Sequence, residues 1–188
     1  MNIIVKKVRH QFIETQCPQC GHIEKMKIPK QLLSNNQYGT GIQALALTLM
    51  NEGYVSINRT AFIIKGLTQG QITPSEGYIS KLNKRLYQCL ETFENEMKKE
   101  IVKLKITHWD DEITFTNDTV ERGLRTSKTK MKVLGQFNNI KSAQYFAGIK
   151  SYIETGHRYG IGSYRLIKAA LEGRAYTIEE MKKHNEFD

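Results

Sequence analysis

Apolar residues recur at a helical spacing between residues 75 and 105, and this pattern constrains the fold more than any other feature. From the first to the last of them the chain runs 22 residues in six steps, a mean of about 3.7 residues per step. This spacing fits a straight amphipathic helix and does not fit a long left-handed coiled coil. We therefore expect one long helix with Ser75 as its N-cap. Its apolar positions are Leu82, Leu86, Leu90, Phe93, Met97, Ile101 and Leu104.

Shorter helical patterns lie on both sides of this segment, so we expect a mainly α-helical protein. Apolar residues indicate helices at 42–53 and 58–65, each followed or ended by a glycine that acts as a stop signal. Thr177 and Glu180 form a capping box that would begin a short last helix. Towards the C-terminus the pattern predicts three further helices, at 118–134, 141–157 and 162–172.

The first residues of the chain depart from this helical pattern. Residues 3–28 are rich in β-branched side chains around the turn Cys17-Pro-Gln-Cys20-Gly21. This arrangement predicts two strands joined by a Cys-X-X-Cys knuckle. We expect three regions: a small β-hairpin with the zinc-knuckle-like turn at 1–34, a helical region at 35–105, and further helices within 106–188.

The Cys-X-X-Cys turn is of the type that binds zinc. Two thiolates three residues apart can hold one side of a tetrahedral ion, and the glycine lets the turn close. A complete site needs four ligands, and the chain has no second Cys-X-X-Cys. Cys17 and Cys20 therefore bind zinc with help from histidine or a second subunit, or they form a reduced turn without metal. The remaining candidate ligands are His10, His22 and the distant Cys89.

Cysteine usage and hydropathy indicate where the protein resides. Three cysteines are too few for a disulfide framework, which favours a reducing compartment. The starting sequence MNIIVKKVRHQF has no apolar stretch of the length found in signal peptides. No run approaches the roughly 18 apolar residues that a membrane helix needs. We expect a cytoplasmic protein with no membrane partner.

The charge balance favours a polyanionic partner. Lysine and arginine number 28 against 19 aspartate and glutamate residues, a formal net charge of +9, and such an excess is typical of nucleic-acid binding. Residues 57–86 have the order of a helix-turn-helix, with Lys81, Lys84 and Arg85 placed to contact phosphates or base edges. The turn is longer than the standard three or four residues. The alternative is therefore a helical hairpin with solvated lysines.

A second basic segment, residues 113–137, has carboxylates near its head. Glu121 follows Asp118 by three residues, which is the capping-box position. Upstream, three consecutive acids at 110–112 either hold Mg²⁺ or lie in a solvated loop. The five basic side chains of the segment are candidates for DNA phosphate contacts. They are Arg122, Arg125, Lys128, Lys130 and Lys132.

Taken together, these residues resemble the transposases of the insertion-sequence 66 type. The Cys-X-X-Cys turn is similar to the second half of the zinc-binding motif of that family. The stretch HWDD at 108–111 is similar to the block that carries the first catalytic aspartate, and FTNDTVERGLR at 115–125 to the block that carries the catalytic glutamate. The DNA-binding region of the family is similar at 37–39, 58–61 and 75–77, and the match continues through 128–137 and 142–152.

The resemblance implies catalytic roles for Asp110 and Glu121, with 106–188 a remnant of a catalytic region. In the family, a long ribonuclease-H-like domain separates these two residues and supplies a second catalytic aspartate, whereas here they are only eleven residues apart. The upstream half of the zinc motif is missing as well. The chain therefore looks like an internally deleted transposase. A short connector holds carboxylates poorly for two Mg²⁺ ions, so we expect Glu121 to act as a helix cap.

These observations lead to three expectations about function. The first is a non-catalytic DNA-binding protein that recognises the ends of its parent element and competes with the full transposase. The second is a protein-interaction module that inhibits another protein, including the intact transposase through mixed oligomers. The third is a residual Mg²⁺-dependent transposase or nuclease assembled across a homo-oligomer.

Overall fold

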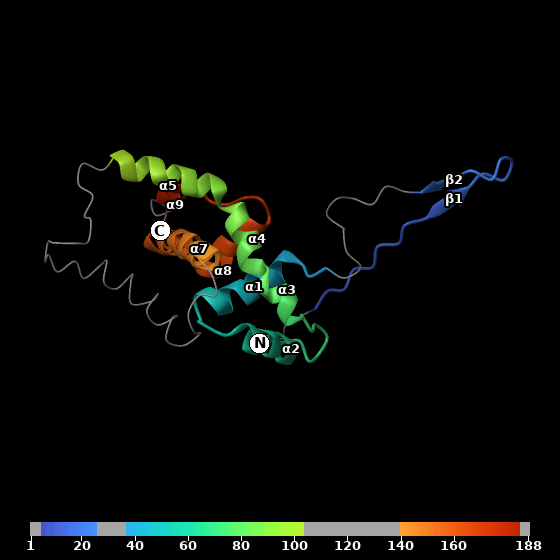
Figure 1. Cartoon of the computed structure of the whole chain (residues 1–188), viewed down its shortest axis with the longest axis horizontal. Coiled ribbons are helices and arrows are strands. Elements are labelled where there is room, and N and C mark those ends of the chain that lie inside the picture. The colour runs from blue at the N-terminus through green and yellow to red at the C-terminus, as the bar shows by residue number, and fades with distance from the viewer. Residues whose placement is uncertain (1–4, 26–36, 104–139, 185–188) are drawn as a thin grey trace, which may run out of the picture. The chain divides into compact units, whose positions relative to one another are not determined.

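The computed structural model describes residues 5–25, 37–103 and 140–184 of the chain. The chain divides into two compact units, residues 1–39 and 40–188. Across the described ranges the protein is mainly helical, with one two-stranded antiparallel hairpin in the first unit (Figure 1). This confirms the expected mainly helical class with an N-terminal hairpin. No helix within the described ranges is both long enough and apolar enough to cross a membrane.

The hairpin consists of β1 (Glu14–Gln16) and β2 (Ile23–Lys25). The strands pair with Glu14 opposite Lys25, and these two side chains form an ion pair of 3.0 Å. The connecting turn is closed by the backbone N–H of Cys17, which donates to the His22 carbonyl at 2.8 Å. All residues of both strands are exposed, so the hairpin buries none of its own strand side chains.

The second unit begins with α1 (Thr40–Asn51) and α2 (Ile57–Leu67). The predicted helices at 42–53 and 58–65 are thereby confirmed. Ser56 is the N-cap of α2, and its hydroxyl accepts a hydrogen bond from the Arg59 backbone N–H at 3.4 Å. Capping of this kind satisfies an N–H that has no partner within the helix.

The single long helix expected from residue 75 is wrong. The segment forms three consecutive helices, with breaks at Lys81 and Leu90. At the second break the Leu90 N–H donates to the Tyr87 carbonyl, three residues back, and Figure 1 shows α5 turned away from the line of α4. Regular apolar spacing identifies the buried side of each piece but not a change of axis between pieces. The helices are α3 (Glu76–Ser80), α4 (Leu82–Cys89) and α5 (Glu91–Lys103).

The start of this segment agrees with the prediction from sequence. Ser75 is the N-cap of α3, and its hydroxyl accepts a hydrogen bond from the Tyr78 N–H at 3.2 Å. The apolar spacing correctly identifies a buried side as far as Phe93, which is 2% exposed, whereas Ile101 is 47% exposed. Before the break at Leu90, the aliphatic side chains of α3 and α4 are therefore buried in the core. At the far end of α5 they are exposed to solvent.

Three helices complete the unit: α7 (Ile140–Arg158), α8 (Ser163–Leu171) and α9 (Ile178–His184). They confirm the helices predicted at 141–157 and 162–172. The predicted capping box is also present, since the Glu180 N–H donates to the Thr177 hydroxyl at 3.2 Å and the Thr177 N–H donates to the Glu180 carboxylate at 2.8 Å. The helix predicted at 118–134 lies outside the described residues.

Helices from the two predicted regions 35–105 and 106–188 share one hydrophobic core. In that core α1 packs against α8, and α4 packs against α7. Tyr152 of α7 is fully buried, makes an edge contact with Phe93 at a ring separation of 5.0 Å, and its hydroxyl accepts a hydrogen bond from the Tyr176 N–H at 3.0 Å. These segments, far apart in sequence, therefore form one folded unit.

Candidate nucleic-acid interface

Three cations predicted to contact DNA lie together on α4 and at its start. Lys81, Lys84 and Arg85 are all exposed, while Leu82 and Leu86 of the same helix are buried. Residues three and four apart occupy neighbouring positions on one helix surface. The burial of the two leucines therefore directs the three basic side chains to the solvent side of the helical unit.

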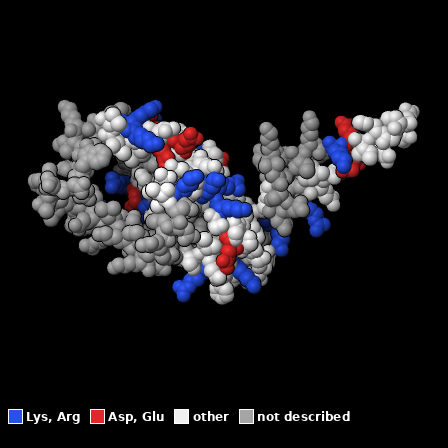
Figure 2. Space-filling model, viewed as in Figure 1, with Lys and Arg blue, Asp and Glu red and all other residues white. Residues whose placement is uncertain are grey.

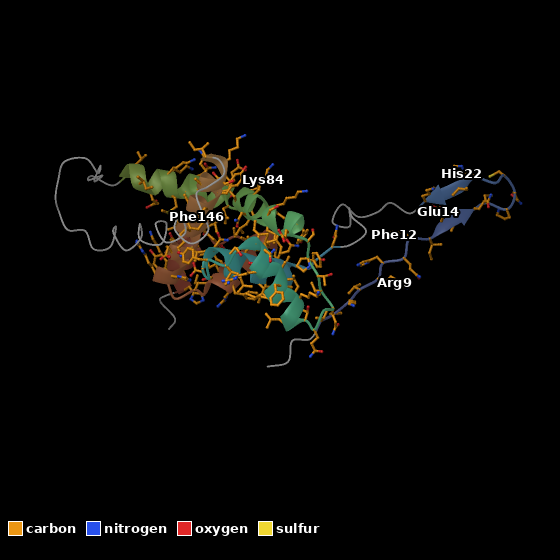
Figure 3. The ribbon with its side chains drawn as sticks, turned by 60° about the horizontal axis from the view of Figure 1, so that its bottom comes forward. Arg9, Phe12, Glu14, His22, Lys84 and Phe146 are labelled. Atoms are coloured by element: carbon orange, nitrogen blue, oxygen red, sulfur yellow. The ribbon has the colours of Figure 1, made fainter. Side chains whose placement is uncertain are left out.

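No carboxylate interrupts this basic surface along the chain. Between Gly77 and Leu90 the sequence has three basic and no acidic residues. Figure 2 shows lysine and arginine side chains gathered over α4, and Figure 3 labels Lys84 on the same helix. Among the described residues, neither the two lysines nor Arg85 forms an ion pair with a carboxylate. Within the described part of the chain, their charge is therefore not neutralised by an ion pair.

The positive charge of Arg85 on α4 also affects the pKa of a neighbouring thiol, that of Cys89. Burial raises the pKa of Cys89, and the positive charge of Arg85 opposes that shift without cancelling it. Cys89 therefore stays a neutral thiol near neutral pH, which makes it a weak metal ligand because metals bind the thiolate. The inward side of α4 is therefore uncharged, and the three basic side chains lie on the exposed side.

Within 57–86 a helix, a connecting turn and two short helices follow one another, and the turn is longer than in a standard helix-turn-helix motif. Residues 68–75 join α2 to α3. Thr68 organises this turn, since its hydroxyl donates to the Ile64 carbonyl at 2.8 Å and accepts from the Ile72 N–H at 3.2 Å. Gln69 and Gly70 both have positive φ, 51° and 77°. The connection is thus a well hydrogen-bonded turn, and α2 packs against α3.

The outer side of α2 carries further candidate residues that the sequence patterns missed. Arg59, Phe62 and Lys65 are all exposed, and 75% of the surface of Phe62 is accessible to solvent. Thr60 and Ile64 of the same helix are buried. Phe62 lies two residues from each of them, which is about 200° around a helix. That offset from the buried positions was the signal that could have identified it.

The Cys-X-X-Cys turn brings its two cysteines together. Hydrogen bonds to the Cys17 sulfur from the backbone N–H groups of Cys20 and Gln19, together with one from the Cys20 side chain, lower the pKa of Cys17. A lowered pKa favours the thiolate, the form that binds metal. Within the part of the chain that is described, however, no three histidine, cysteine or acidic residues cluster as metal ligands. The described residues therefore show two cysteines in one turn and no group of three or more candidate metal ligands.

The remaining predicted site residues all fall within residues 110–132 of the sequence. The catalytic candidates Asp110 and Glu121 lie outside the described residues, and so do the acids beside them. The five basic residues of the segment 113–137 lie there as well. Their assignments stay predictions from the sequence. The residues concerned are Arg122, Arg125, Lys128, Lys130 and Lys132.

Comparison with known proteins identifies no family for the chain. No protein-family model, no curated protein and no solved structure matches the chain. The candidate interface is therefore defined by the charges and exposure of α2 and α4 alone.

Proposed function

We propose that the chain is a DNA-binding, non-catalytic derivative of a transposase of the insertion-sequence 66 type. The observation that carries the DNA-binding part is the cluster of Lys81, Lys84 and Arg85. These three residues are exposed, form no ion pair with a described carboxylate, and lie on α4 or at its N-cap. The formal net charge of +9 supports the same partner class. The transposase part rests on the resemblance of sequence motifs.

Most of the proposed contacts of α4 are made to phosphates. A helix rises about 1.5 Å per residue, so the step from Lys81 to Arg85 is roughly 6 Å along the axis. Successive base pairs are about 3.4 Å apart, so these side chains can reach neighbouring phosphates of one strand. Arg85 can bind one phosphate through two parallel hydrogen bonds, and the lysines act as point charges. Contacts of this type give affinity and orientation, whereas base contacts give sequence preference.

A salt titration of DNA binding tests the proposal. Each phosphate neutralised contributes a slope of about 0.9 in log affinity against log salt. Replacing Lys81, Lys84 and Arg85 by glutamine should therefore reduce the slope by roughly 2.7. The probe is a duplex with the terminal repeats of the parent element, measured by fluorescence anisotropy. A duplex of scrambled sequence shows whether the ends are preferred.

A charge-matched variant supplies the control. Lys98 and Lys99 on α5 and Lys183 on α9 are also exposed, and replacing them by glutamine removes the same net charge elsewhere. We expect a smaller change in slope from this variant than from the α4 variant. Equal losses of slope in the two variants would show that the overall charge of the protein determines the slope, and not the position of the cations on α4. Absence of binding, or binding that ignores salt, would contradict the proposal.

The non-catalytic part has a separate test. We expect no Mg²⁺-dependent nicking of the same duplex, because Asp110 and Glu121 are only eleven positions apart in the chain. Two-metal cleavage needs carboxylates held rigidly around ions about 3.5–4 Å apart. Cleavage by the wild-type chain that disappears in Glu121→Gln would instead establish a nuclease. A protein partner retained after nuclease treatment would favour the interaction module.

A further inference from the structure

The exposed side of α2 combines an aromatic ring with positive charge. Phe62 is 75% exposed, although water contact with so much apolar surface is unfavourable. Arg59 precedes it by three residues and Lys65 follows it by three, and both are exposed. Positions three apart are neighbours on a helix surface, so the ring lies between two cations. We call Arg59, Phe62 and Lys65 the α2 aromatic face.

The surroundings of the α2 aromatic face leave the ring accessible. Around Gly66, the residue four beyond Phe62, no described group outside the nearby backbone of its own helix and its two chain neighbours lies within 4 Å of the position a Cβ would occupy. α2 itself contains no acidic residue. The Glu76 carboxylate of α3 accepts a hydrogen bond from the Asn58 side chain at 2.9 Å. Among the described residues, neither cation of this face is in an ion pair.

We propose that the α2 aromatic face binds an unpaired base of DNA, with Phe62 stacked on the base and Arg59 and Lys65 on the adjoining phosphates. This inference rests on the proposed DNA-binding function and specifies the DNA structure that the protein prefers. Charge complementarity selects a polyanion, and the aromatic ring selects one that offers flat apolar surfaces. In intact duplex the neighbouring bases cover those surfaces, whereas an unpaired base exposes them. The preferred DNA therefore contains a bulge, a frayed end or a single strand.

The test compares two DNA probes with the same number of base pairs, a fully paired duplex and the same duplex with one added unpaired thymine at its centre. The measured quantity is the ratio of the two affinities for the full-length chain, by fluorescence anisotropy. Stacking of a base on an aromatic side chain is worth about 5- to 150-fold in affinity by alanine substitution. Phe62→Ala should lower the ratio by a factor in that range. Phe62→Trp should keep it.

Two further variants distinguish stacking from simple hydrophobic contact. Phe62→Leu retains apolar area but has no ring, so it should lower the ratio as alanine does. Phe12→Ala removes a phenylalanine that is 38% exposed on the hairpin unit and should leave the ratio unchanged. A Phe62→Leu variant that behaves like wild type would overturn the stacking inference, and so would a Phe62→Ala ratio equal to that of wild type.

The outcomes separate this inference from the function on which it rests. If the wild-type chain binds neither probe, the proposed function fails. If it binds both probes equally and Phe62→Ala changes nothing, only the inference about the α2 aromatic face fails. If Phe62→Ala instead turns a dimer into a monomer in analytical ultracentrifugation, the face is a contact between copies of the chain, and base stacking is overturned. Because Phe62 is exposed, its replacement should leave the protein folded. A circular dichroism melt of each variant can verify this.

Discussion

The two units of the chain differ in how they are held together. In the helical unit, every helix that the structure describes contributes buried side chains to one core, such as Leu47, Leu86 and Ile149. In the hairpin unit no residue of the described range 5–25 is buried, and Phe12 and Ile13 are 38% and 68% exposed. One unit is stabilised by apolar burial, and the other by backbone hydrogen bonds and turn geometry.

This difference matters because a two-stranded hairpin without a core is marginal in water. Apolar burial is the largest favourable contribution to folding, and the described hairpin has almost none. The order of its turn therefore depends on local contacts, such as the N–H of Gly21 donating to the Cys17 carbonyl at 2.9 Å. The helical unit should tolerate changes in the hairpin, whereas the hairpin should respond strongly to any ligand of its thiols.

The largest effect should come from emptying the centre of the helical core. Tyr152→Ala removes a fully buried ring and its hydrogen bonds, and we expect a loss of about 3–5 kcal/mol in the free energy of unfolding. The matched change in the hairpin, Phe12→Ala, should stay within about 0.5 kcal/mol. Urea unfolding followed by far-ultraviolet circular dichroism measures both. A comparable loss from Phe12→Ala would show that the hairpin contributes to the stability of the helices.

A second experiment tests how closely α7 and α8 approach. A Cβ at Gly156 would overlap the Leu166 side chain of α8, so Gly156→Ala should cost about 1–3 kcal/mol through overpacking. Gly66→Ala is the control, since that position on α2 has open space around it. There alanine should stabilise the helix by about 0.5–1 kcal/mol. Thermal unfolding of the two variants should shift in opposite directions, and equal shifts would contradict the packing described.

A smaller effect should appear in the pH dependence of the helical unit. The pKa of Glu172 is lowered, first by a hydrogen bond from Arg174 and then by one from the Thr40 hydroxyl at 3.1 Å. A carboxyl with a lowered folded pKa contributes stability above its ordinary value of 4.5, and that stability is lost as the pH falls through the folded pKa. Glu172→Gln should unfold at lower temperature than wild type near neutral pH.

The unfolding temperatures of the wild type and of Glu172→Gln should then converge as the pH falls below 4.5, the ordinary pKa of this carboxyl. Calorimetry across the acid range measures this convergence. Glu24→Gln, on strand β2 of the hairpin, serves as the control and should leave the unfolding profile of the helices unchanged. A constant offset between Glu172→Gln and wild type at every pH would indicate a packing effect and not a titration.

The smallest effect on the helical unit should follow from changing the thiols. Replacing Cys17 and Cys20 by serine should move the free energy of unfolding of the helices by less than about 0.5 kcal/mol. Zinc added to the wild-type chain should shift amide resonances of residues 14–25 if the predicted knuckle is completed by another ligand, and the serine variant should show no such shift. Absence of a zinc response in the wild type would leave the turn as a reduced dithiol.

Local sequence signals were accurate wherever the interactions were local. Ser75 as an N-cap and the Thr177–Glu180 capping box depend on contacts within three residues, and both are present. The exposure of Lys81, Lys84 and Arg85 follows from the leucines beside them. The single helix from Ser75 was wrong, because a change of axis at Leu90 preserves the apolar spacing. Phe62 was missed, because a strongly apolar residue is ordinarily assigned to the core.

By itself the sequence determined which of the described segments are helical, where several of them begin, and that the chain is strongly basic. These properties follow from capping, periodicity and charge, which act over a few residues or over the whole composition. Only the tertiary structure decided that helices on both sides of residues 104–139 share a core, that the segment 76–103 is broken at Lys81 and Leu90, and that an aromatic ring of α2 remains in water. Those features depend on which surfaces meet, because burial is set by contacts between residues distant in the chain.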